Sequence, residues 1–343
     1  MQLFCLILKT KIMKFKEVIG IDVGKLSNEV IIHSNQRGNK FGNSTIGYKA
    51  MLKWVLQHVS CTKEELLFAF EHTGLYSFPL SVFLTENRIS FVIIPGLEIK
   101  RSVGIQRGKN DKVDAKRIAL YTYRRITEIK LYKLPSNTLI KIRRLLSLRD
   151  RLVIQRAGYI KNHKENTKFL EKSDNKLFFE VHEKMLEVLS SEISKLDNEL
   201  DKLINEDTSL IKLFNLITSI KGVGKQTALF MLAFTNGFTL FDNWRKFASY
   251  AGTAPFPYQS GISINGRTKV NHLANKKFKA LLNMCATSSI VCNPEMKAYF
   301  ERRKAEGKNG MSTINIIRNK ILARIFAVVN RGTPYVNTCK YAA

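Results

Sequence analysis

The chain has 343 residues, of which 56 are Lys or Arg and 28 are Asp or Glu, giving a formal net charge of +28. The charged fraction, 24%, is ordinary for a globular protein, so the charge is unusual in its sign alone. With 45% hydrophobic residues the chain is not a disordered basic tail, and its charge indicates a folded protein that binds a polyanion, most commonly nucleic acid. Its length predicts about two or three domains, at roughly 100 to 200 residues each.

The N-terminus and the cysteines give no sign of secretion. The apolar run 3–8 precedes a group of lysines instead of following one, and it is too short to span a membrane; no later stretch predicts a span. Met13 is a second candidate start. The 5 cysteines are odd in number and show no CxxC or zinc-finger spacing, so we expect neither a disulfide framework nor a structural zinc, in a reducing cytoplasm.

The first third of the chain predicts an α/β domain. A hairpin of strands over 18–23 and 28–33 comes first. The elements predicted next are a helix over 50–59, a strand over 66–70, a helix over 78–84 and a strand over 91–94. This order favours a mixed sheet with helices on it. A helix over 112–123 follows, with Asp111 as its N-cap and Asp114 in its first turn, and Pro135 marks a boundary.

Residues 136–206 contain almost no Pro or Gly and have apolar residues at helical spacing. They predict two long helices, broken near 173–175, each of about 35 residues and roughly 50 Å long. We expect an antiparallel pair that separates domains or dimerises. A plain helical bundle without a partner is the alternative.

The next segment, ITSIKGVGKQT, has the outline of a helix-hairpin-helix. Gly222 and Gly224 would let the backbone approach a phosphate, with Lys225 and the amides of the following helix pointing at it. The alternative is an ordinary connection between two helices. A turn-rich loop over 253–267 and helices over 275–290 and 312–330 complete a mainly α half; the last helix is expected to be structural or oligomerising.

Four carboxylates carry the sharpest pattern of candidate chemistry. Asp22 and Glu71 each end a strand that reads as buried, and Asp111 and Asp114 share one face of a helix start. If the strands are neighbours and the helix packs beside them, the four converge, and each like-charge pair at ~4 Å costs several kcal/mol unless a cation lies among them. Oxygen ligands without His or Cys select Mg²⁺ or Mn²⁺, and two such ions can activate phosphodiester displacement. Taken singly, each acid could instead be a cap or a solvated surface residue.

The same start, IGIDVGK, also fits the phosphate turn of actin-like and sugar-kinase ATPases. That interpretation requires a second glycine-rich phosphate loop and an adenosine site, and neither is found downstream.

Ser260, in PYQSGIS, is the candidate nucleophile. It lies in a Gly/Pro/Ser-rich loop beside the basic residues Arg267 and Lys269. A serine in such a loop is usually a turn residue, because its hydroxyl is a poor nucleophile until something activates it. A metal-bound carboxylate cluster from elsewhere in the fold could supply that activation.

These motifs carry a family resemblance. In order, IGIDVGK, FEHTG and GKNDKVDAKRIA resemble the DEDD transposases of bacterial insertion sequences, the IS-one-ten group. The later segments IKGVGKQTA, FASYAGTAPFPYQSGISINGRTKV and NHLANKKFKALL are similar to the C-terminal transposase domain of that family.

The resemblance implies three parts. A RuvC-like, ribonuclease-H-like domain over 14–134 would bind Mg²⁺ through Asp22, Glu71, Asp111 and Asp114, and a coiled-coil segment over 135–207 would follow. A C-terminal transposase domain over 208–335, with the helix-hairpin-helix, would carry Ser260 as the catalytic serine. Ser263 is close enough that a small misalignment would exchange the two, and Ser260 is preferred because it directly precedes Gly261.

The resemblance also implies an activity. Family members are recombinases that work as tetramers, in which the serine of one subunit completes the carboxylate site of another and forms a transient covalent link to DNA. A noncoding bridge RNA pairs with donor and target DNA, which agrees with the basic composition. Nucleic-acid contacts are expected at Gly222, Gly224, Lys225, Arg267 and Lys269. The alternatives are a Holliday-junction nuclease that uses water and a nucleic-acid-binding protein without nuclease activity.

Overall fold

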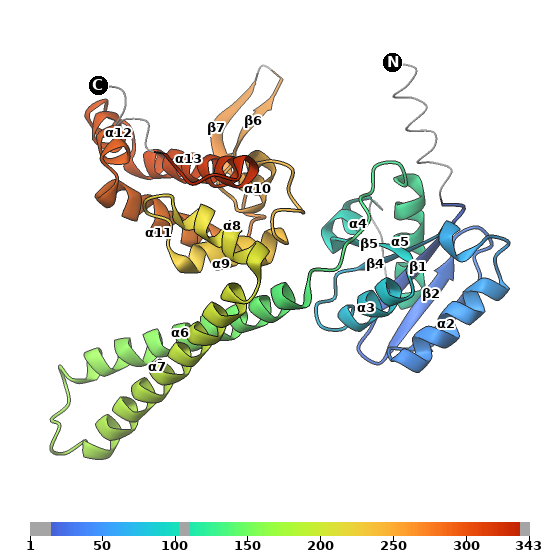
Figure 1. The fold of residues 1–343 in the computed structure, drawn as a ribbon, viewed down its shortest axis with the longest axis horizontal. Helices are drawn as coiled ribbons and strands as arrows, with labels where there is room; N and C mark the ends of the chain where they lie inside the picture. Colours follow the sequence, from blue (N-terminus) through green and yellow to red (C-terminus); the bar gives the residue numbers. More distant parts are fainter. Residues whose placement is uncertain (1–14, 103–109, 262, 337–343) are drawn as a thin grey trace. The chain divides into compact units, whose positions relative to one another are not determined.

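The computed structural model describes residues 15–102, 110–261 and 263–336 (Figure 1). The candidate start at Met13 lies outside them. The chain divides between Leu134 and Pro135 into two compact units, each with its own hydrophobic core.

The first unit is built on a mixed five-stranded sheet in the order β3-β2-β1-β4-β5. Its strands are β1 (Glu17–Val23), β2 (Ser27–Ile32), β3 (Gly38–Gly42), β4 (Leu66–Glu71) and β5 (Ser90–Ile94). β1, β2 and β3 form an antiparallel meander, whereas β4 and β5 run parallel to β1. The predicted mixed sheet is confirmed, and it is compatible with a RuvC-like domain.

Successive side chains of each strand point to opposite faces of the sheet, so the core of this unit has two layers. Helices α2 (Thr45–Gln57) and α3 (Phe78–Glu86) cover one face of the sheet and pack on strand side chains such as Ile19 and Phe68. Helices α4 (Gly96–Ser102) and α5 (Asp111–Arg124) cover the other face, which includes Val18 and Leu67.

The structure differs from the predicted elements of this unit in four places. β3 (GNKFG) and the seven-residue α4 were not predicted, because neither has a clear apolar period. α2 begins at Thr45, earlier than expected, because Ser44 caps it by accepting a hydrogen bond from Gly47 N. The N-cap of α5 is Asn110, whose side chain accepts from Lys112 N, so Asp111 is the first helical residue and not the cap.

The second unit begins with the two long helices α6 (Asn137–Asn166) and α7 (Lys176–Asn205), which pack against each other. Contacts such as Arg149 with Asp197 and His163 with Phe179 show that they run antiparallel. Each has 30 residues, slightly fewer than expected, because the break spans 167–175. The helical pair is confirmed, but its supercoiling and its part in association stay predictions.

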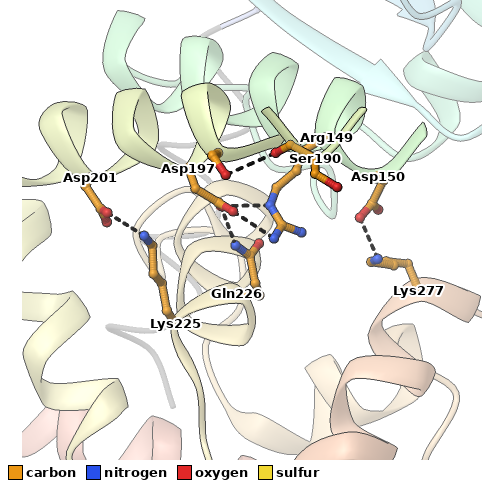
Figure 2. A network of polar contacts seen from close by, with 9 residues as sticks. Arg149, Asp150, Ser190, Asp197, Asp201, Lys225, Gln226 and Lys277 are labelled. Atoms are coloured by element: carbon orange, nitrogen blue, oxygen red, sulfur yellow. Dashed lines mark hydrogen bonds and ion pairs between the residues drawn. The ribbon is translucent and has the colours of Figure 1, made fainter. Parts of the chain in front are cut away.

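Polar contacts tie this helical pair to the rest of its unit (Figure 2). Arg149 makes a bidentate pair with Asp197, with N–O distances of 2.7 and 2.9 Å. Asp197 also accepts from Gln226 of α9 (Lys225–Thr235), and Lys277 of α11 (Lys276–Cys292) pairs with Asp150 of α6 at 2.6 Å. One end of the pair, including Leu146 and Leu200, is buried in the main core of the unit.

The remaining helices build that core. They are α8 (Thr208–Thr218), α9 (Lys225–Thr235), α10 (Trp244–Tyr250), α11 (Lys276–Cys292), α12 (Pro294–Ala305) and α13 (Gly310–Arg331). α12 was not predicted. α13 has a structural role, since Ile317, Ile321 and Ile325 are fully buried in the core.

The segment expected to be a loop around Ser260 is a β-hairpin. Strands β6 (Pro255–Ser260) and β7 (Ile264–Val270) pair antiparallel, and Figure 1 shows them projecting from the helices of this unit. The two prolines conceal the strand pattern in the sequence, and an exposed two-stranded ribbon tolerates them. No described helix is long and apolar enough to cross a membrane.

Candidate active site

Asp22 and Glu71 lie side by side at one edge of the sheet. β1 and β4 are adjacent and parallel, and Ile21 pairs with Phe70, so the next positions along both strands are Asp22 and Glu71. Both side chains belong to the face that holds Val18 and Leu67, because side chains alternate along a strand. Both are partly exposed, whereas the preceding residues of their strands are buried.

Helix α5 covers the same face, with its N-terminus at the same edge. A Cβ placed on Gly20 would collide with the backbone of Ala115 and Ala119, so α5 packs directly on β1 at that glycine. The C-terminal end of the helix lies at the other end of the strand, because Tyr123 stacks on His33, whose N–H donates to the carbonyl of Val18. The helix therefore runs opposite to the strand. Its first turn, with Asp111 and Asp114, therefore lies toward the end of β1 that carries Asp22. The two strands are thus neighbours and the helix packs beside them, as the prediction required. Convergence of the four carboxylates themselves stays a prediction.

Gly96, the first residue of α4, makes room for Glu71. A Cβ on Gly96 would collide with the Glu71 carboxylate. The position therefore favours a residue without a side chain, and sequence reasoning missed it. Its signal was the Pro-Gly pair directly after the apolar run FVII.

The four carboxylates suit a hard divalent ion in their chemistry, since all are oxygen donors. Asp111 is exposed, and Asp114 pairs with Arg117 at 2.7 Å, a contact that the sequence analysis did not anticipate despite its i,i+3 spacing. In the part of the chain that the structure describes, no three acidic, His or Cys side chains are gathered closely enough to hold a metal ion. Metal binding by these residues stays a prediction, and Asp114 would have to leave Arg117 to take part.

Ser260 is the last residue of β6 and is exposed. It pairs across the hairpin with Ile264, and Gly261, with φ of 56°, begins the turn. Ser263 is also exposed, within the turn. Arg267 and Lys269 lie on β7 of the same ribbon. Ser260 belongs to the second unit and the carboxylates to the first.

The glycine turn joins α8 to α9, as the sequence predicted, but its residues have structural partners. Gly222 has φ of 91°, and a Cβ there would collide with Ser289 of α11. The ammonium of Lys225 pairs with Asp201 of α7 (Figure 2). Gly224, by contrast, caps α9 with open space around it. Binding of a phosphate by this turn stays a prediction, and Lys225 would have to leave Asp201 to take part.

Comparison with known proteins covers most of the chain. A family model described as a transposase, of the DEDD type of IS110, matches residues 19–168, and the model of the transposase IS116/IS110/IS902 family matches residues 214–301. The first match contains Asp22, Glu71, Asp111 and Asp114, and the second contains Ser260.

Two similar proteins align along nearly their whole length. They are the pilin gene-inverting proteins of Moraxella bovis and Moraxella lacunata, each 28% identical over 336 residues, which cover 93% of this chain and 98% of the relative. A third, an uncharacterized 43.6 kDa protein of insertion element IS110 from Streptomyces coelicolor, is 30% identical over 120 residues, 35% of this chain and 29% of the relative. The chain therefore belongs to the IS110 family of transposases and is a DNA recombinase.

Proposed function

We propose that this transposase cuts and rejoins DNA with Ser260 as nucleophile and with Asp22, Glu71, Asp111 and Asp114 as ligands of Mg²⁺ or Mn²⁺. The observation that carries the metal site is the parallel register of β1 and β4, which brings Asp22 level with Glu71 on the face that α5 covers. Two carboxylates at one level of adjacent strands repel each other strongly unless a cation lies between them.

The exposure of Ser260 supports its role as the nucleophile, because it leaves the hydroxyl accessible to DNA. Its Oγ would bond to the scissile phosphorus and its proton would pass to a carboxylate or to solvent. The bond from phosphorus to the 3′ oxygen would break, and that oxygen would take up a proton from the same carboxylate or from solvent. The products are a 5′-phosphoserine and a free 3′-hydroxyl. Attack by another 3′-hydroxyl would restore Ser260 and reseal a strand, so no bond energy is lost to water. A bound Mg²⁺ would stabilise the charge on the phosphate oxygens.

The two halves of this site lie in different units of the chain, so the reaction requires them to meet, within one subunit or between two. We propose the second arrangement, in a tetramer, with a noncoding bridge RNA pairing to donor and target DNA in the cytoplasm, associated with the nucleoid. The charge of +28 supports the binding of an RNA together with donor and target DNA, because three nucleic acids need a large basic surface. The names of the Moraxella relatives describe inversion of a pilin gene in those hosts, which requires the same cutting and rejoining.

A denaturing gel tests the serine mechanism. Purified protein would be incubated with labelled DNA from the ends of its element, the flanking transcript and Mg²⁺, and compared with Ser260→Ala and with Ser263→Ala as the matched control. We expect a protein–DNA band that survives denaturation in wild type and Ser263→Ala and is absent in Ser260→Ala. Free nicked DNA from wild type and Ser260→Ala, with no adduct, would instead show a nuclease that uses water.

A further inference from the structure

The β6–β7 ribbon carries an exposed aromatic ring beside Ser260. Tyr258 is 68% exposed, although tyrosine side chains usually bury much of their ring. Tyr258 and Ser260 are two residues apart on one strand and so share a face, about 7 Å apart along it. The directly opposite positions on this face are Gly266 and Ile264.

Gly266 holds the Tyr258 ring close to the ribbon. A Cβ built on Gly266 would lie 2.9 Å from Cδ1 of Tyr258, so the ring occupies the space that any other residue would fill. One side of the ring is thus supported by backbone and the other faces solvent. An aromatic ring fixed in this way is a flat surface on which a planar group can stack.

The surroundings of the ring are basic and hollowed. A shallow pocket of about 360 Å³ lies between Tyr258, Phe256, Arg267 and Lys269. The hairpin 255–270 contains no Asp or Glu. Neither Arg267 nor Lys269 takes part in an ion pair among the described residues of the chain.

We propose that Tyr258 is a stacking platform for one unpaired nucleobase next to the scissile phosphate, while Arg267 and Lys269 bind the phosphates that flank it. This inference rests on the proposed role of Ser260. It adds that the DNA strand bound at Ser260 is locally unpaired. Aromatic rings beside cations are how proteins hold single strands without reading their sequence. A nucleic acid strand fits this surface better than an acidic partner protein does, because each nucleotide brings a planar base and a phosphate together.

Photocrosslinking tests the platform directly. The full-length protein would be irradiated with single-stranded DNA in which thymine is replaced by 5-iodouracil, and the crosslinked residue identified by mass spectrometry. We expect crosslinking at Tyr258, its loss in Tyr258→Thr, and a reduced yield in Gly266→Ala, whose Cβ displaces the ring. Ser260→Ala should crosslink like wild type. Crosslinks only at other sites would overturn the proposal.

Binding measurements give the size of the effect. Titrations at one salt concentration would use labelled oligothymidylate and an abasic strand of equal length and charge. Tyr258→Phe should bind oligothymidylate as wild type does, and Tyr258→Thr about 5- to 150-fold more weakly, since a stacked base contributes that much. The abasic strand should not distinguish the three proteins. Phe169→Thr, which removes a ring that is 85% exposed elsewhere in the same unit, is the matched control.

The two proposals fail separately. A crosslink at Tyr258 without any covalent serine adduct in wild type would leave the platform standing and remove the serine mechanism. An adduct that forms at Ser260 while Tyr258→Thr binds oligothymidylate like wild type would do the reverse. A change of oligomeric state in Tyr258→Thr, with DNA binding unaltered, would assign the ring to a contact between subunits.

Discussion

The carboxylates and the serine of this transposase are held in opposite ways. Asp22 and Glu71 stand at the ends of strands whose other residues are buried, and their edge is fixed by a helix that touches the strand backbone at Gly20. Ser260 stands on a ribbon whose first strand is exposed along its whole length. The proposed metal site would need ligands that are held rigidly, whereas the proposed nucleophile would need to be accessible to DNA. Substitutions at the carboxylate edge should therefore change stability and activity together. Substitutions on the ribbon should change activity without changing stability.

Asp22→Asn should have the largest effect. Replacing a charged ligand by an amide weakens the metal site, and we expect strand cleavage to fall by about 100-fold or more. The measurement is the rate of cleavage as Mg²⁺ is titrated. Asp174→Asn, an exposed acid in the 167–175 loop, is the matched control and should cleave at the wild-type rate. Unchanged Mg²⁺ dependence in Asp22→Asn would remove Asp22 from the site.

Gly20→Ala tests the scaffold beneath the carboxylates. Its Cβ meets helix backbone, which cannot rotate away, so the free energy of unfolding of the first unit should fall by about 1–3 kcal/mol in urea denaturation. Gly158→Ala in α6, where nothing lies within 4 Å of the new Cβ, should instead gain about 0.5–1 kcal/mol. Equal stability of Gly20→Ala and wild type would mean that α5 is not fixed at this strand.

Gly96→Ala tests whether the position of Glu71 affects cleavage independently of the stability of the fold. The new Cβ meets the end of a flexible side chain, Glu71, which can turn away, so stability should change by less than about 1 kcal/mol. Cleavage should still fall by about 10-fold, because a displaced ligand weakens the metal site. Wild-type cleavage, measured in the same titration as for Asp22→Asn, would show that the position of Glu71 is not critical.

Asp197→Asn should have the smallest effect, in the second unit. Partial burial raises the pKa of Asp197, but the hydrogen bonds and charge of Arg149, with help from Gln226, outweigh it and hold the pKa below its ordinary value. A carboxyl whose pKa is lower in the folded state than in the unfolded state contributes stability at pH values above its unfolded-state pKa. That contribution is lost as the pH falls through the folded-state pKa.

The variant should therefore be less stable than wild type by about 0.5–1.5 kcal/mol at pH 7, with the difference shrinking below about pH 4. Thermal denaturation across this pH range measures it. A difference that stays constant into acid would show that the pair with Arg149 does not carry the effect.

The sequence predicted four of the five strands of the sheet because each contains an apolar run, and it missed β3 (GNKFG), which has none. It also led to the prediction that Asp22, Glu71, Asp111 and Asp114 lie at one edge, since strand ends and a helix start can be identified from local sequence pattern. It could not predict the Gly96 contact with Glu71 or the Asp114–Arg117 pair, which depend on how elements pack. The ribbon around Ser260 was taken for a loop because Pro255 and Pro257 obscure a strand that has no buried face.

The most direct test of the central claim is to locate the DNA link on the protein. Trypsin should release residues 247–267 from the denatured adduct as one peptide containing Ser249, Ser260 and Ser263, together with Tyr258. After the DNA is digested, fragmentation in the mass spectrometer should place the remaining nucleotide on Ser260. A nucleotide on Ser263 or Tyr258, or an unmodified peptide from DNA that has been cut, would contradict the account.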